Sequence, residues 1–131
     1  MYKRSVALLV VAAAAFISYA CGGVTSPSQN KQDTFSGTLA LSGSAFFPVN
    51  VANGGEFSVK ITALSPTATA TVGVGWYQGA NCELVVQQGY GQLNTPALAG
   101  AVLQKGPYCV GVFDVGGMAV AQNFTVVVSH P

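Results

Sequence analysis

The chain carries little charge. Asp, Glu, Lys and Arg make up 7% of its 131 residues. From Cys21 onward there are three lysines and four acidic residues, so this part has a net charge of −1 (3 − 4). No stretch gathers the Lys and Arg that neutralise nucleic-acid phosphates. We therefore exclude nucleic acid as a partner.

Side chains that perform catalysis or hold metals are equally sparse. The single histidine, His130, stands next to last, where we expect a frayed chain end. The acidic residues stand singly rather than at metal-ligand spacing; they are Asp33, Glu56, Glu83 and Asp114. Asp114 is most simply a turn residue, and a carboxylate pair assembled from distant strands has no support in the sequence. We predict no metal site, no cofactor and no catalytic residue, and hence no enzyme.

The composition favours an all-β fold. The chain has 16 glycines and many Val, Thr and Ala, with few Glu, Lys or Leu. Such a composition is typical of strands joined by tight turns rather than of helices. A chain of 131 residues can bury one modest core, so we expect one folded domain.

The first 20 residues have the pattern of an export signal. Lys3 and Arg4 form a short basic region, and residues 5–20 are uncharged and largely apolar. This stretch is short for a membrane-spanning helix, and two glycines follow Cys21 directly. We predict a signal peptide over residues 1–20, with a retained transmembrane anchor as the alternative.

Residues 17–21, Ile-Ser-Tyr-Ala-Cys, resemble the lipobox of bacterial lipoproteins. The resemblance implies that Cys21 receives diacylglycerol and becomes the new N-terminus, anchored to a membrane. Ser18 and Tyr19 depart from the usual lipobox residues, so an ordinary signal with an incidental cysteine is the alternative. Three cysteines in an exported protein leave one unpaired, and the position of Cys21 makes it the odd one.

Residues 21–33 are expected to form a flexible tether, because they are rich in Ser, Pro and Gln and have little to bury. The domain would then span residues 34–131, held at the cell envelope. Gly22 after the cysteine resembles the pattern that sorts lipoproteins to the outer membrane, so we expect the outer membrane or the cell surface.

Eight segments have the apolar alternation of strands, clearest over residues 57–62, where Phe, Val and Ile alternate with Ser, Lys and Thr. Turn residues separate these segments. The predicted strands are Phe35–Leu41, Phe46–Val51, Phe57–Thr62, Thr69–Tyr77, Cys82–Gln87, Leu98–Leu103, Tyr108–Val115 and Phe124–Val128. Several short strands at such spacing indicate a β-sandwich. Trp76 falls on the apolar row of its predicted strand, so we expect its side chain in the core.

Cys82 and Cys109 are predicted to form a disulfide that joins two strands, since an exported protein keeps such bonds oxidised. A redox or metal pair is the weaker alternative, because there is no Cys-x-x-Cys and no nearby histidine.

Residues 47–59, 106–112 and 124–128 together resemble the bacterial pre-peptidase C-terminal domain. The resemblance spans residues 35–130 and implies a jelly-roll-like sandwich that acts as a non-catalytic module of secreted proteins. Gly43, Ser44 and Ala45 stand where that family often has acidic residues, so a calcium site is not implied.

A polar loop over residues 87–94 is the best candidate for binding, since it combines amide groups with one aromatic ring. The candidate residues are Gln87, Gln88, Tyr90, Gln92 and Asn94. A plain solvated loop is the alternative, and a partner could instead meet a sheet face, where Tyr77 and Phe113 alternate out of phase with buried neighbours.

Two functions stay open. The first is a structural or adhesive envelope module that contacts protein or polysaccharide. The second is a carrier with a small-ligand pocket between its sheets, which a domain of this size can hardly spare. We favour the first.

Overall fold

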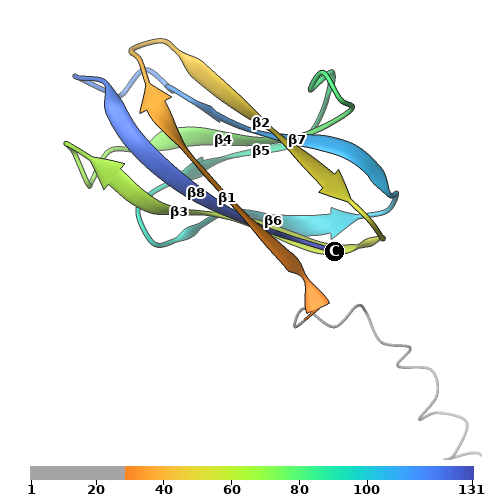
Figure 1. The fold of residues 1–131 in the computed structure, drawn as a ribbon. Coiled ribbons are helices and arrows are strands. Elements are labelled where there is room, and N and C mark those ends of the chain that lie inside the picture. Colours follow the sequence, from red (N-terminus) through yellow and green to blue (C-terminus); the bar gives the residue numbers. More distant parts are fainter. Residues whose placement is uncertain (1–28) are drawn as a thin grey trace, which may run out of the picture.

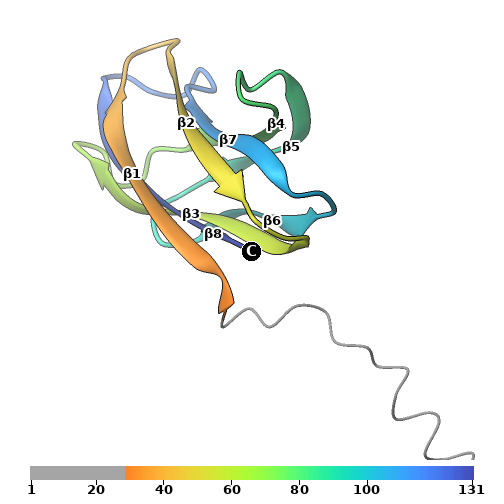
Figure 2. The same ribbon diagram turned by 45° about the vertical axis from the view of Figure 1, so that its right-hand side comes forward.

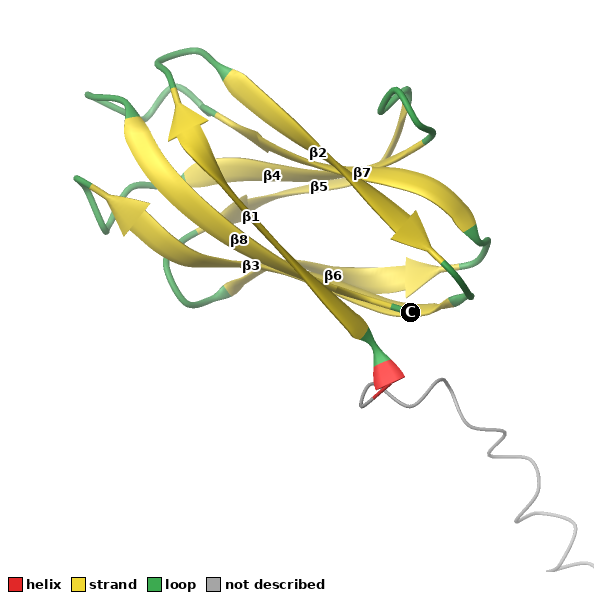
Figure 3. Cartoon of the chain, in the orientation of Figure 1, coloured by secondary structure: helices red, strands yellow, loops and turns green. Residues whose placement is uncertain are grey.

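The computed structural model describes residues 29–131. The predicted signal peptide, Cys21 and the tether up to Ser28 lie outside the described residues. Eight strands are present, and the predicted all-β sandwich is confirmed (Figures 1 and 3). They are β1 (Lys31–Leu39), β2 (Ser44–Val51), β3 (Gly55–Ser65), β4 (Val72–Gln78), β5 (Leu84–Gly91), β6 (Pro96–Val102), β7 (Gly106–Phe113) and β8 (Gln122–His130).

The strands form two four-stranded antiparallel sheets. Their orders are β1-β8-β3-β6 and β2-β7-β4-β5, and only β4 and β5 are both consecutive and paired. Most connections therefore cross from one sheet to the other, as in an eight-stranded jelly roll. Figure 2 shows the two layers, with β5 beside β6 at one long edge and β1 beside β2 at the other. The jelly-roll-like prediction is confirmed.

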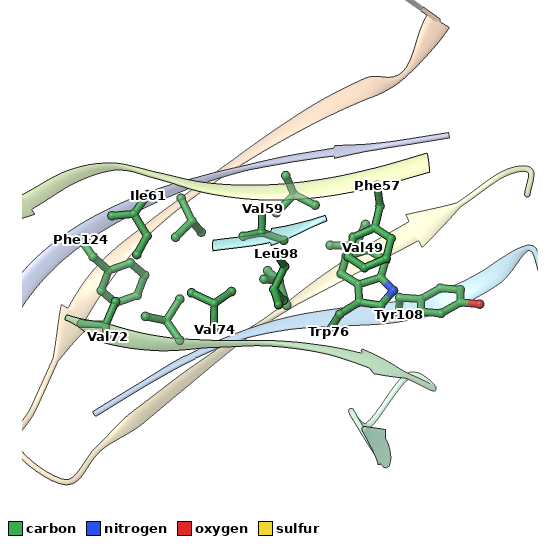
Figure 4. Packing of buried hydrophobic residues seen from close by; sticks show 14 of the residues in the cluster. Val49, Phe57, Val59, Ile61, Val72, Val74, Trp76, Leu98, Tyr108 and Phe124 are labelled. Carbon is green, nitrogen blue, oxygen red and sulfur yellow. The ribbon is translucent and has the colours of Figure 1, made fainter. Parts of the chain in front are cut away.

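The core lies between the sheets and is lined by alternate residues of the strands other than β5 (Figure 4). Trp76 is fully buried, as predicted. Its ring stacks between Phe57 of the facing sheet (centroids 4.5 Å apart) and Tyr108 of β7 (5.3 Å). Aromatic side chains bury large areas, so this stack is a main contact between the two sheets.

Both ends of the domain are more ordered than the sequence predicts. The tether was expected to reach Asp33, but β1 already begins at Lys31, which pairs with His130 at the end of β8. The expected frayed end at His130 is also wrong, because this side chain is 1% exposed. The reason is a contact that no local pattern shows: His130 Nε2 lies 3.0 Å from a carboxylate oxygen of Asp33.

The predicted disulfide between Cys82 and Cys109 is confirmed, with Cα atoms 5.4 Å apart. It ties the turn between β4 and β5 to the middle of β7. Within residues 29–131, no helix is long and apolar enough to cross a membrane.

Candidate binding surface

The predicted polar loop is mostly a strand. Gln87 to Gly91 belong to β5, and only the residues after Gly91 form a turn. The loop prediction is wrong because Gln, Gly and Tyr can join a ladder when the paired strand, here β4, is strongly apolar. The five candidates therefore do not form one cluster, since successive residues of a strand point to opposite faces.

The amide side chains of this segment are already used within the chain. Gln88 donates to the Tyr77 hydroxyl (2.9 Å), Gln87 to the backbone oxygen of Ala99 (3.3 Å), and Gln92 to the Thr71 hydroxyl (3.3 Å). The backbone N–H of Asn94 donates to the carbonyl of Ile61 (2.8 Å). These residues therefore brace the fold.

Tyr90 is different, because its side chain is 73% exposed. It points outward from the β2-β7-β4-β5 sheet, in one ladder row with Gly73 of β4 and Phe113 of β7. We call this outer side the aromatic face. It consists of Ser44, Phe46, Pro48, Asn50, Gly73, Gly75, Tyr77, Val85, Gln88, Tyr90, Pro107, Cys109, Gly111 and Phe113.

Three glycines let the aromatic rings of this face lie flat on the sheet. A Cβ on Gly73 would collide with the Phe113 ring, and one on Gly75 with the Tyr77 ring. A Cβ on Gly111 would come within 2.7 Å of the Phe46 ring. Tyr77 is only 7% exposed as a result, although it stands on the predicted outer row. Phe46, which meets Tyr77 edge to face (5.4 Å), stays 47% exposed.

The aromatic face is uncharged. None of the four strands that the structure shows in this sheet contains Asp, Glu, Lys, Arg or His. Glu83 and Asp114 stand just outside it, before β5 and after β7. An exposed aromatic surface without charge suits an apolar partner, because no ion has to be stripped of water on contact.

The opposite outer side, on the β1-β8-β3-β6 sheet, is made of small polar side chains. We call it the hydroxyl face. It consists of Thr34, Ser36, Thr38, Glu56, Ser58, Lys60, Thr62, Ala99, Ala101, Asn123, Thr125, Val127 and Ser129. Its groups bond one another, as Ser36 with Thr125 (2.8 Å) and Thr38 with Asn123 (2.7 Å). Its apolar members are Val127, Ala99 and Ala101, and none of its residues is aromatic.

The titratable side chains Asp33 and His130 form hydrogen bonds within the fold. Partial burial opposes ionisation of Asp33, but hydrogen bonds from His130 and Lys31 outweigh it and lower the pKa of this carboxyl below its usual 3.8. The other ring nitrogen of His130, Nδ1, lies 3.3 Å from the carbonyl oxygen of Pro131. Within residues 29–131 no serine or cysteine side chain is a hydrogen-bond partner of this imidazole.

Asp114 is a turn residue, as predicted. Its carboxylate accepts from the backbone N–H of Ser42 and of Gly116 (both 2.8 Å), which lowers its pKa. Among residues 29–131 no three His, Cys, Asp or Glu side chains come together as metal ligands would.

The hollows do not favour a carrier. The one lined by both sheets, with Gln78 and Tyr108 on its wall, measures about 230 Å³. Sites for small molecules usually measure ~300–1,000 Å³ and enclose the ligand. A depression of about 620 Å³ lies outside β3 and β6, over small residues such as Ala99 and Ala101. A hollow of about 330 Å³ lies between the loop before β4 and the loop before β8, with Ala70 and Met118 on its wall.

Phe46 and the glycines were not predicted as parts of this surface. A signal was available: Gly73 and Gly75 occupy the outward positions of a strand whose inward positions are all large. Glycine at successive outward positions leaves room for rings from neighbouring strands. Which rings fill that room depends on the sheet order, which one sequence does not show.

No protein-family model matches the chain, and no curated protein sequence matches it. The resemblance to the pre-peptidase C-terminal domain therefore stays a prediction. Among solved structures, the chain is similar to Aeromonas hydrophila PliG, a periplasmic lysozyme inhibitor of g-type lysozyme, with a TM-score of 0.56 and 12% identity. The match covers 81% of this chain and 91% of that one, and it concerns the fold.

Proposed function

We propose that this chain is an exported, non-catalytic protein that binds a protein of the cell envelope through its aromatic face. In this proposal a lipid on Cys21 anchors it to the membrane. The observation that carries the proposal is the uncharged aromatic face of one sheet, on which Tyr90 is 73% exposed and Phe46 47% exposed. The cores of protein interfaces are poor in charge and rich in aromatic side chains.

The side-chain bonding favours a protein over a polysaccharide. Sugar hydroxyls are bound by free amide and carboxylate groups beside an aromatic ring. Here the amide nitrogen of Gln88 is already bonded to Tyr77, and that of Gln87 to Ala99. The surface left around Tyr90 is aromatic and aliphatic, including Val85, which is 52% exposed.

The structural neighbour supports a role in protein binding. Its name describes it as an inhibitor of a lysozyme, so this type of sandwich can serve a non-catalytic protein whose target is another protein. At 12% identity the likeness does not extend to the target, and the proposal names no lysozyme.

Retention on immobilised envelope extract tests the proposal, with the full-length protein applied to native and to protease-treated extract. We expect retention on the native extract only. Tyr90→Ala should lower it roughly tenfold, as truncation of an aromatic anchor does. The matched control is Thr34→Ala, an exposed strand residue of the hydroxyl face.

Two results would overturn the proposal. Retention that survives protease treatment would identify a polysaccharide as the partner. Equal retention of the Tyr90→Ala and Thr34→Ala proteins would remove the aromatic face from binding. Both substitutions are at exposed positions, so the free energy of unfolding should change by less than about 0.5 kcal/mol.

The anchor is tested separately. The mass of the wild-type protein should exceed that of the mature polypeptide by a diacylglycerol group and attached acyl chains. Cys21→Ser should lose this mass and leave the membrane fraction. A wild-type protein of unmodified mass would refute the lipid anchor and leave the binding proposal untouched.

A further inference from the structure

The first strand begins and the last strand ends at the same end of the sandwich. β1 begins there at Lys31, and the carbonyl of Pro131 accepts from the backbone N–H of Ala52 beside it. β6 ends at the same end of the molecule (Figures 1 and 2). We call it the entry end.

The entry end exposes aliphatic side chains. Leu103, in the loop after β6, is 90% exposed, Leu84 at the start of β5 is 60% exposed, and Val86 is 49% exposed. Val86 and Leu103 line one hollow together with Gln78, and Gln78 is the ladder partner of Leu84. The three aliphatic side chains therefore form one patch, outside the aromatic face.

The charge at this end is mixed. Within residues 29–131 Lys31 is paired with Asp33 (3.1 Å), and Glu56 and Glu83 also lie at this end. Lys105 follows Leu103 by two residues, is exposed and has no acidic partner among these residues. An exposed leucine beside a lysine suits a membrane interface, where the aliphatic chain enters the lipid and the ammonium group meets phosphate.

The length of the chain before the domain sets how far this patch can be from a membrane. Cys21 and Lys31 are ten residues apart, which span at most ~35 Å when fully extended. Across the sheet, β1 and β6 are separated by three strand spacings, ~15 Å. A lipid on Cys21 would thus keep Leu103 within reach of the surface.

We propose that the entry end rests on the lipid bilayer, with Leu103, Leu84 and Val86 inserted at the headgroup level and Lys105 against lipid phosphate. This inference rests on the lipid anchor of the proposed function. It fixes the orientation of the domain and leaves the aromatic face, on the side of the sandwich, free for a protein.

Fluorescence quenching by lipid tests this orientation. The full-length lipidated protein carries a bimane label at Leu103→Cys and is reconstituted into phosphatidylethanolamine–phosphatidylglycerol vesicles that contain brominated lipid. The control is Leu41→Cys, an exposed leucine (53%) in the loop after β1, at the opposite end. The label at 103 should be quenched about twofold or more relative to that at 41, because interfacial side chains lie ~5–10 Å within the headgroup region.

A second variant pair probes the patch itself. A label at Leu84→Cys should be quenched too, and Leu103→Asp should abolish that quenching, because a carboxylate resists insertion. Equal quenching at 103 and 41 in protein of confirmed lipidated mass would overturn the orientation and leave the anchor standing. Protein of unmodified mass would refute the anchor and, with it, this inference.

Discussion

The two outer faces of the sandwich belong to sheets of the same kind, each with four antiparallel strands, but they carry different side chains. On the hydroxyl face, short side chains bond each other across strands, as Ser36 does with Thr125. On the aromatic face, rings lie on glycines, as Tyr77 does on Gly75. On the first face, these hydroxyl and amide groups are bonded within the sheet and leave little apolar area exposed. The second leaves apolar area in water, which a folded monomer rarely keeps without use.

The largest effect on stability is expected from the disulfide, whose Cys109 belongs to the aromatic face. Replacing both Cys82 and Cys109 with alanine removes a cross-link between residues 27 positions apart. The free energy of unfolding should fall by roughly 3–4 kcal/mol, because the unfolded chain is no longer constrained. Urea unfolding measures this loss. A cost below about 1 kcal/mol would mean that β7 and the β4–β5 turn are held by other contacts.

Gly75→Ala should have the next largest effect. The added methyl group must displace the Tyr77 ring and break its hydrogen bond with Gln88, so we expect a loss of about 1–3 kcal/mol in the free energy of unfolding. Gly117→Ala is the control, since nothing lies within 4 Å of its added Cβ. Similar values for the two variants would show that the ring is not seated on the glycine.

Acid should weaken the sheet of the hydroxyl face through Asp33. Its pKa is lowered in the folded protein, so it stabilises the fold above the usual value of 3.8, and this contribution is lost as the pH falls through the lowered pKa. Asp33→Asn should cost about 1–2 kcal/mol at neutral pH, and this cost should shrink as the pH falls through the lowered pKa of Asp33. A cost that does not change with pH would exclude ionisation of this carboxyl as its cause.

The smallest effect is expected on the hydroxyl face itself. Ser36→Ala removes an exposed hydrogen bond with Thr125 and should change the free energy of unfolding by about 0.5 kcal/mol or less. Envelope retention should not change either. A drop in retention with this variant would indicate that the partner binds the hydroxyl face, which contradicts the proposed function.

The sequence predicted the number and kind of elements because period-2 alternation and turn residues are local signals. Trp76 in the core and the Cys82–Cys109 bond followed from position and compartment. The order of strands, and with it the rings over Gly73 and Gly75, depends on contacts far apart in the chain. Local reasoning could not supply them.

Errors arose where a distant residue changed the meaning of a local pattern. His130 looks like a loose end until Asp33, 97 residues earlier, is placed beside it. The amides around Tyr90 look free until Tyr77 and Ala99 are placed as their acceptors. Tyr90, the one aromatic ring of this polar, glycine-containing stretch, is exposed, as a role in binding requires.

Photocrosslinking in living cells tests the central claim most directly. A photoreactive phenylalanine analogue replaces Tyr90 on the aromatic face in one strain and Thr34 on the hydroxyl face in another, in otherwise wild-type protein. Position 90 should yield a discrete protease-sensitive adduct, which excess unlabelled wild-type protein suppresses and which position 34 does not form. Adducts of equal yield at both positions, or none at position 90, would contradict the assignment of the aromatic face as the protein-binding surface.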